Sequence, residues 1–337
     1  MYIREDMNDS EKWNWDTKRI LVKCGGFSSQ LARNVSEKVD GDPLWGSRFD
    51  ATNPEAVIQT HLDFLRNGAD IILTNTYQSS VEGFMKYLGV TRERGVELIQ
   101  KSVQLARQAK EQYLSEIGSE LESALPLILG SIGPYGAYLH DGSEYSGNYV
   151  ENISKEQLKA WHRTRIEICL AAGVDGLALE TLPCQLEAEA VTELVLDNFP
   201  DAKFWVSMQC RDEKHLASGE TFAEAALSVW RLVQSRKAEN RLLGIGLNCV
   251  NPLFVTPLLS SLTKVAGSDR IPLVVYSNRG EIYDTEQGEW TGTGEEVVKF
   301  VPEWLQLGVR IVGGCCRVYP TDVLAIRTYV DGLNIKP

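Results

Sequence analysis

The chain has 337 residues, which is enough for about two domains of ordinary size or for one barrel-type domain. Hydrophobic residues make up 43% and charged residues 24%, as in a globular protein, so a disordered or fibrous chain is excluded. Asp and Glu (46) outnumber Lys and Arg (34), and the formal net charge is -12. This balance argues against nucleic acid and anionic membrane surfaces as partners, and it favours a cationic small molecule.

The chain begins with a polar, acidic arm over residues 1–19, which lacks the features of a signal peptide. No run of 18 apolar residues occurs, so we expect no membrane association and a cytoplasmic location. The seven cysteines are an odd number. In a reducing compartment they should be thiols, and a cluster of them would indicate metal binding or catalysis.

Short apolar runs alternate with segments of helical periodicity along the whole chain. Eight runs fit, with no room for a ninth, and this alternation predicts a parallel sheet covered by helices. Eight repeats favour a single-domain α/β fold, a (β/α)8 TIM barrel over residues 20–337. An open sheet with fewer strands and a small second domain is the alternative. The runs lie near Ile20–Val22, Ile71–Leu73, Leu127–Leu129, Gly176–Leu179, Phe204–Ser207, Leu243–Leu247, Leu273–Tyr276 and Val309–Val312.

Two helices are marked clearly at their starts. Asn53 followed by Pro54 predicts a helix that ends near Gly68, and the capping box Ser154-x-x-Gln157 predicts another. By contrast, the segment Phe27–Thr52 shows no periodicity. A loop of that length in a compact domain usually acts as a lid or a binding loop.

Three cysteines lie where strands of the predicted barrel end. Cys249 follows the sixth run, and Cys315 and Cys316 follow the eighth. We expect Gly313 and Gly314 to permit a tight turn, with positive φ available, that directs both sulfurs inward. Three thiolates converging without a fourth protein ligand describe a zinc site with one open position, one Zn²⁺ per chain. The alternative is that the adjacent cysteines are small buried apolar residues.

Glu180 ends the fourth apolar run, so its carboxylate should point into the mouth of the barrel. A buried carboxylate is costly unless it is paired. The sequence therefore predicts a cationic partner for Glu180, either a substrate ammonium or a buried Arg.

Taken together, these motifs resemble those of zinc-dependent homocysteine S-methyltransferases. The resemblance extends through almost the whole chain, and that family folds as a (β/α)8 barrel. The residues that carry it are Gly25-Gly26-Phe27, Thr74-Asn75-Thr76-Tyr77, Ser131 to Leu139, Asp141-Gly142-Ser143-Glu144-Tyr145, Glu180-Thr181, Asn248-Cys249, Tyr276 to Glu281 and Gly313-Gly314-Cys315-Cys316-Arg317.

The resemblance implies an enzyme that methylates L-homocysteine to methionine. Cys249, Cys315 and Cys316 would bind Zn²⁺, and Glu180 would hold the substrate ammonium. The family usually has Asp where this chain has Cys24, so Glu180 is left as the main carboxylate for the amino acid. The residues expected to form the substrate site are Cys24, Asn75, Thr76, Tyr77, Ser131, Gly133 and Glu180.

A positively charged methyl donor would be held by aromatic faces. The candidates are Trp45, Tyr77, Tyr138 and Tyr145. Members of the family that use betaine typically carry a longer C-terminal arm, so the short segment after Cys316 favours a sulfonium donor. We expect S-methylmethionine first, S-adenosylmethionine second, and betaine as the alternative.

Other functions remain open at this stage. Because Cys24 stands where the family usually has Asp, the sequence is also compatible with a zinc-binding barrel whose methyl-transfer activity is weak or lost. A zinc hydrolase would need His or carboxylate ligands, and only His140 and His215 lie near the predicted mouth. A redox role would require a strained disulfide between Cys315 and Cys316. Monomer and dimer are both compatible with the sequence, and we expect the remaining cysteines to be packing residues, namely Cys169, Cys184 and Cys210.

Overall fold

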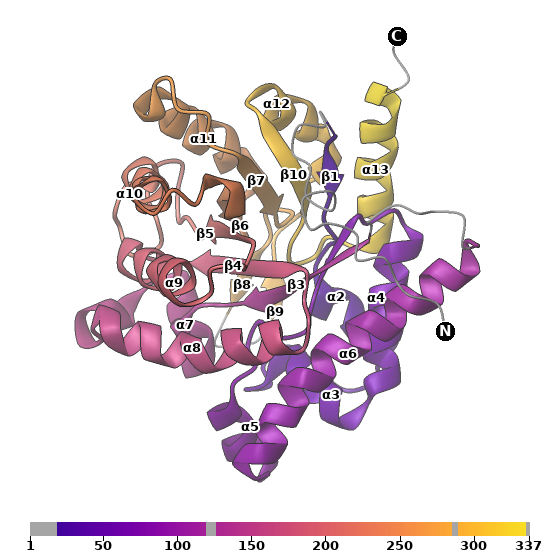
Figure 1. Cartoon of the computed structure of the whole chain (residues 1–337). Coiled ribbons are helices and arrows are strands. Elements are labelled where there is room, and N and C mark those ends of the chain that lie inside the picture. The colour runs from indigo at the N-terminus through magenta and orange to yellow at the C-terminus, as the bar shows by residue number, and fades with distance from the viewer. Residues whose placement is uncertain (1–18, 119–125, 285–288, 335–337) are drawn as a thin grey trace, which may run out of the picture.

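The computed structural model describes residues 19–118, 126–284 and 289–334. Eight parallel strands form a nearly closed barrel surrounded by helices, which confirms the predicted fold class (Figure 1). Around the barrel the strands are β1 (Leu21–Val22), β10 (Val309–Gly314), β7 (Leu273–Ser277), β6 (Leu242–Asn248), β5 (Phe204–Met208), β4 (Gly176–Leu182), β3 (Leu127–Ile132) and β2 (Ile71–Leu73).

The first strand joins both ends of this sheet. Lys23, the residue directly after β1, donates its backbone N–H to the Val312 carbonyl at 2.8 Å and forms a parallel bridge with Ile71. The Cys24 N–H then donates to the Ile71 carbonyl at 2.8 Å. Strand β1 therefore lies between β10 and β2, and the residues just after it reach the carboxyl end of the barrel, where active sites of this fold form.

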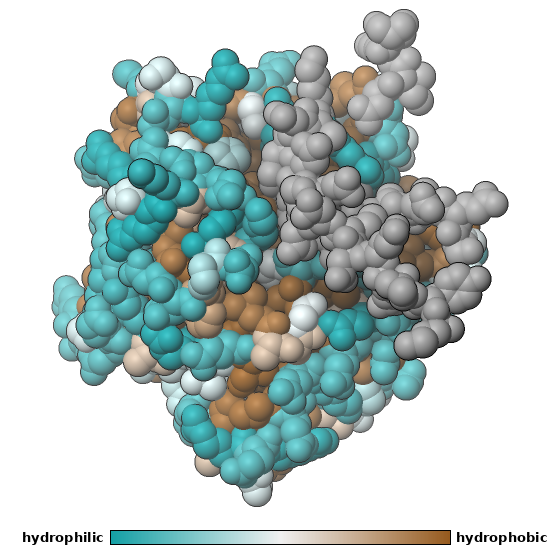
Figure 2. All heavy atoms as spheres, viewed as in Figure 1, coloured by the Kyte–Doolittle hydropathy of each residue, from teal (hydrophilic) through white to brown (hydrophobic). Residues whose placement is uncertain are grey.

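The helices cover the outside of the barrel, and the surface seen in Figure 2 is mostly hydrophilic. No helix in the described ranges combines the length and apolar character needed to cross a membrane. The helices are α2 (Phe27–Asn34), α3 (Phe49–Thr52), α4 (Pro54–Arg66), α5 (Val81–Leu88), α6 (Arg92–Glu116), α7 (Tyr135–Leu139), α8 (Lys155–Ala171), α9 (Gln185–Asn198), α10 (Phe222–Ser235), α11 (Pro252–Ala266), α12 (Val301–Gln306) and α13 (Pro320–Asn334).

Both helix starts expected from the sequence are confirmed. The Asn53 side chain accepts a hydrogen bond from the Ala56 N–H at 3.2 Å, with Pro54 in the first turn of α4. At α8, the side chains of Ser154 and Gln157 each bond to the backbone of the other. These caps satisfy N–H groups that have no partner inside the helix.

The segment 27–52 differs from the expected loop, because it contains α2, α3 and the 3-10 turn Trp45–Arg48. Its apolar residues explain the difference. Leu31 and Phe49 are almost fully buried and pack with Val57 of α4 in a small cluster beside the main core. Burial of this apolar surface stabilises a helical excursion that local periodicity does not reveal.

One further difference is an insertion. Between β7 and β10 the chain adds a two-stranded antiparallel hairpin, β8 (Ile282–Asp284) and β9 (Glu289–Thr291), which the count of eight runs missed. Strands this short carry too few residues to show a periodicity.

Of the arm expected over residues 1–19, all but Arg19 lies outside the described residues. Arg19 itself forms an ion pair with Asp70 at 3.2 Å.

Candidate metal centre and substrate pocket

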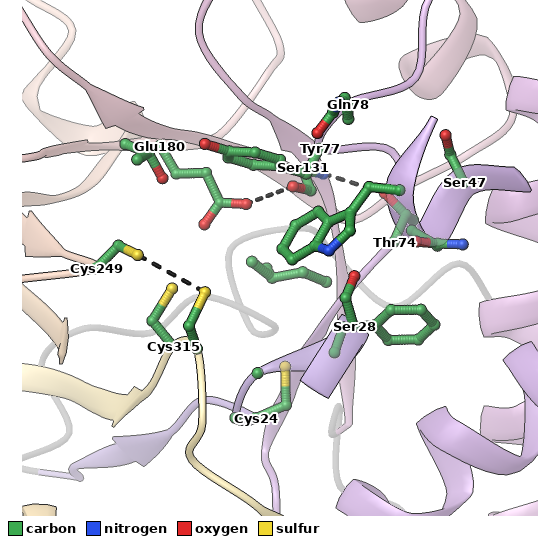
Figure 3. Close-up of a pocket in the computed structure, with 18 of the residues that line it drawn as sticks. Cys24, Ser28, Ser47, Thr74, Tyr77, Gln78, Ser131, Glu180, Cys249 and Cys315 are labelled. Carbon is green, nitrogen blue, oxygen red and sulfur yellow. Dashed lines mark hydrogen bonds between the residues drawn. The ribbon is translucent and has the colours of Figure 1, made fainter. Parts of the chain in front are cut away.

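Three sulfurs meet at the carboxyl end of the barrel. Cys249 follows β6, Cys315 and Cys316 follow β10, and their Sγ atoms all lie within 4.8 Å of one another. Cys249 Sγ and Cys316 Sγ are 3.7 Å apart. Figure 3 shows the side chain of Cys249 directed toward that of Cys315. The structure thus brings together the three residues that the sequence nominated as metal ligands.

The geometry of these sulfurs fits a metal ion. With Zn–S bonds of about 2.3 Å, tetrahedral coordination separates sulfurs by about 3.8 Å, close to the observed spacing. Hydrogen bonds from Cys249 and Cys316 hold the pKa of the Cys315 thiol well below its usual range. A thiolate that is already favoured at Cys315 is suited to a divalent cation with affinity for sulfur.

The turns that aim the sulfurs are built differently from the expectation. Gly313 and Gly314 do not adopt positive φ; the left-handed residues near the sulfurs are Cys249 (φ 52°) and Arg317 (φ 65°). The glycines are needed for space instead. A Cβ on Gly313 would lie 2.4 Å from the Lys23 carbonyl oxygen, and one on Gly314 would lie 2.1 Å from the Val318 side chain. Close packing of β10 against its neighbours, rather than turn geometry, therefore requires this pair.

Glu180 of β4 faces the same pocket as the sulfurs. Its carboxylate accepts a short hydrogen bond from the Ser131 hydroxyl, and burial raises its pKa to about 7 (Figure 3). The next residue, Thr181, has a positive φ of 59°. Asn248 fixes that conformation: its side chain accepts from the Thr181 N–H and donates to the Thr181 hydroxyl, both at 2.7 Å. The carboxylate is therefore held in place while remaining available to a ligand.

Most of the expected substrate residues line one pocket together with the sulfurs. Five of the seven do so: Cys24, Asn75, Tyr77, Ser131 and Glu180. Thr76 and Gly133 do not line it. The Thr76 hydroxyl donates to the Ser131 carbonyl at 2.8 Å, and Gly133 packs so closely on Tyr77 that a Cβ would lie 2.6 Å from the Tyr77 carbonyl oxygen. These two residues support the wall of the pocket from behind.

The aromatic candidates divide in the same way. Trp45, Tyr77 and Tyr145 line the pocket, with the rings of Trp45 and Tyr77 edge to face and their centroids 5.8 Å apart. Asn75 holds this arrangement, because its amide donates to the Gly46 carbonyl at 2.8 Å. Tyr138 is not among the pocket-lining residues and packs against Trp161. The predicted loop thus contributes Trp45 to the site, as a binding segment would.

Two buried cations near the pocket, Lys23 and Arg165, were not predicted from the sequence. Lys23 lines it directly, and its signal was a single basic residue at the end of an apolar run. Arg165 of α8 lies behind it, where its guanidinium donates to the carbonyls of Tyr77 and Gly133 and so joins two loops of the rim. Neither His140 nor His215 lines this pocket, which leaves the zinc hydrolase without its expected ligands here.

Comparison with known proteins identifies the family of this chain. A family model described as homocysteine S-methyltransferase matches residues 21–330, which is nearly the whole described barrel. The chain belongs to the homocysteine S-methyltransferase family. It is accordingly a methyltransferase, and the family resemblance expected from its motifs is confirmed.

Several relatives and one solved structure show how far the similarity extends. A betaine-homocysteine S-methyltransferase from Drosophila melanogaster is 91% identical over 331 residues, covering 98% of this chain and 100% of the relative. Homocysteine S-methyltransferase 3 from Zea mays is 37% identical, covering 93% and 91%. The metallated form of homocysteine methyltransferase MmuM from Escherichia coli matches with a TM-score of 0.79 and 34% identity, covering 96% and 100%.

Proposed function

We propose that this protein transfers a methyl group from a small cationic donor to the thiolate of L-homocysteine, with Zn²⁺ held by Cys249, Cys315 and Cys316. One observation carries the proposal: three convergent thiols and a buried carboxylate, Glu180, face one pocket. Bound Zn²⁺ would lower the pKa of a coordinated thiol, so that homocysteine is deprotonated near neutral pH. The metallated state named for the Escherichia coli relative supports a metal at this site.

The other residues of the pocket orient the two substrates. Glu180 accepts the ammonium group of homocysteine, because its buried carboxylate is held by Ser131 and faces the pocket. The faces of Trp45, Tyr77 and Tyr145 attract the positive charge of the donor. In the transfer a C–S bond forms to homocysteine, the bond from the methyl carbon to the donor heteroatom breaks, and its electron pair stays on that heteroatom. Opposite charges are neutralised, so a pocket that excludes water favours the step.

The identity of the donor is the finer part of the proposal. The name of the Drosophila melanogaster relative supports betaine, and that relative is matched over its full length by 331 residues. The short segment after Cys316 supports a sulfonium donor, so the two indications point to different donors. We propose a cationic methyl donor of this class, with betaine as the first candidate and S-methylmethionine as the second.

A direct assay tests this function. The purified protein, loaded with zinc, is incubated with homocysteine and either betaine or S-methylmethionine, and methionine is measured. We expect methionine with at least one donor and about one zinc per chain by elemental analysis. Zinc binding without turnover on either donor would contradict the proposal. It would instead support the alternative hypothesis, based on Cys24, that the barrel binds zinc but has lost methyl-transfer activity.

A further inference from the structure

Lys23 occupies an unusual place for a lysine. It follows β1 directly, its backbone joins β10 and β2, and its side chain is only 3% exposed. The ammonium Nζ donates to the carbonyl of Gly314 at 2.9 Å and to that of Gly25 at 3.2 Å. It also lies 4.6 Å from the centroid of the Tyr276 ring. Every direct partner is therefore a neutral group.

A buried ammonium normally requires a nearby carboxylate. Among the described residues no carboxylate forms an ion pair with Lys23. Carbonyl dipoles and one aromatic face compensate only part of the lost hydration of a full charge. The positive charge must therefore be balanced by groups slightly farther away, inside the same pocket.

The groups that supply this balance are those of the proposed metal site. Burial lowers the pKa of Lys23, but Coulombic interactions with Cys24, Cys315, Glu180 and Cys316 raise it overall. Burial raises the pKa of the Cys24 thiol, so Cys24 itself is uncharged near neutral pH and the balancing charge comes from the other groups. Three thiolates and one divalent cation leave one negative charge, and a coordinated homocysteine thiolate adds a second. In addition, the carbonyl that Lys23 binds belongs to Gly314, the residue immediately before the two adjacent ligands.

We propose that Lys23 is a positioning residue of the metal site: its fixed charge balances the negative charge of the three thiolates, and its bond to Gly314 holds the turn that carries Cys315 and Cys316. The inference rests on the proposed function, since it assumes that these cysteines bind zinc. The uncharged Cys24 thiol next to Lys23 leaves that charge directed at the pocket, whereas an aspartate at position 24 would cancel it.

The test compares three substitutions of Lys23 by a measurement that does not need turnover. Lys23→Met keeps the length but removes the charge, Lys23→Gln keeps a neutral donor, and Lys23→Arg keeps the charge. Zinc affinity is measured by competition with a chromophoric chelator, with circular dichroism and thermal unfolding of each variant as the check on folding. We expect Met and Gln to weaken zinc binding by about 10- to 100-fold, as loss of a supporting contact does, and Arg to restore most of it.

A second variant guards against loss of folding in Lys23→Met. Cys24→Asp retains Lys23 and its hydrogen bonds but places a carboxylate beside it, and we expect zinc affinity to fall by about several-fold through charge cancellation. Wild-type affinity in Lys23→Met and Lys23→Gln would overturn the inference. Wild-type affinity in Lys23→Gln together with weak binding in Lys23→Met would overturn the charge balance, because the hydrogen bond to Gly314 would then explain the effect without the charge.

These outcomes separate the inference from the proposed function. If the wild-type protein binds no zinc and forms no methionine, the proposed function itself fails. If it does both and the Lys23 variants bind zinc as tightly, only the role of Lys23 fails. As a further readout, we expect Lys23→Met to raise KM for homocysteine more than it lowers kcat, because the second thiolate then enters a site without its counter-charge.

Discussion

Two buried glutamates show how differently this barrel uses the same side chain. Glu187 of α9 is fully buried, and its carboxylate accepts from the Tyr135 N–H at 2.7 Å, from the Tyr149 hydroxyl and from His162 Nε2 at 2.8 Å. Glu180 of β4 accepts from Ser131 and faces the pocket that holds the sulfurs. A carboxylate whose oxygens already accept hydrogen bonds from several protein donors stabilises the structure. A carboxylate that faces a cavity and has an elevated pKa is available to a ligand.

The comparison extends to the surroundings of each glutamate. The network of Glu187 lies behind the rim, next to Arg165, whose guanidinium is 3.4 Å from His162 Nδ1. Arg165 in turn holds the carbonyls of Tyr77 and Gly133. One region therefore shapes the pocket wall and the other carries its chemistry, so substitutions in the two regions should have separable effects.

The largest effect is expected in the chemical region, at the sulfurs. Cys316→Ala removes one of three protein ligands, and at about 3 kcal/mol per ligand the affinity for zinc should fall by on the order of a hundredfold, with methyl transfer falling at least as far. Metal analysis and methionine formation measure both. Cys169→Ala is the matched control, because that thiol is equally buried but does not line the pocket. Equal losses in the two variants would contradict the assignment.

The next effect is on stability, in the supporting region. Glu187→Gln places an amide NH2 among three donors that previously met a carboxylate, so we expect the free energy of unfolding to fall by about 3 kcal/mol. Chemical denaturation measures the change, and Glu156→Gln at an exposed helix position is the control, with an expected change within about 0.5 kcal/mol. If the free energy of unfolding of Glu187→Gln equals that of the wild type, a full set of hydrogen-bond donors does not identify a structural carboxylate.

The same substitution at Glu180 should act in the opposite way. Glu180→Gln removes the carboxylate for the substrate ammonium, so KM for homocysteine should rise by about 30-fold, corresponding to about 2 kcal/mol. The free energy of unfolding should stay constant or increase, because a poorly solvated charge is lost. Steady-state kinetics and denaturation are measured on one preparation. If Glu180→Gln lowers the free energy of unfolding and leaves KM for homocysteine unchanged, Glu180 is a structural carboxylate and does not bind the substrate.

The pH dependence sharpens the contrast further. Because burial raises the pKa of Glu180 to about 7, the carboxyl of the free enzyme is protonated below that pH and cannot pair with an ammonium. We expect kcat/KM to rise about tenfold from pH 6 to its plateau above pH 7, and this rise to be absent in Glu180→Gln. A pKa above the ordinary value of 4.5 also means that the contribution of Glu180 to stability is full below pH 4.5 and is lost as pH rises through 7. A pH profile unchanged in Glu180→Gln would assign the titration to another group.

The smallest effect concerns Cys24. Cys24→Asp introduces a carboxylate beside Lys23, which would neutralise much of the new charge. We therefore expect KM for homocysteine to change by less than about threefold. A fall of tenfold or more at saturating zinc would show that Glu180 alone does not suffice for the amino group.

The sequence by itself determined the architecture and the main chemical groups. The count of eight apolar runs, the caps at Asn53 and Ser154, and the placement of Cys249, Cys315 and Cys316 just after strands all depend on local patterns. Such patterns are readable because strand and helix periodicities and capping bonds involve residues near one another in the chain. Glu180 was expected to end its strand, but β4 continues to Leu182.

Only the tertiary structure decided which of these residues share a pocket and why their neighbours are required. Thr76, Gly133 and Tyr138 were expected at the rim but support it or lie elsewhere, because side-chain direction depends on contacts with other strands. The glycines before Cys315 are needed for close packing against Lys23 and Val318, which belong to distant or folded-back segments. From the sequence Lys23 is an ordinary basic residue, but barrel closure buries it in the wall of the pocket that holds the three sulfurs. Such long-range electrostatic interactions exist only in the folded chain.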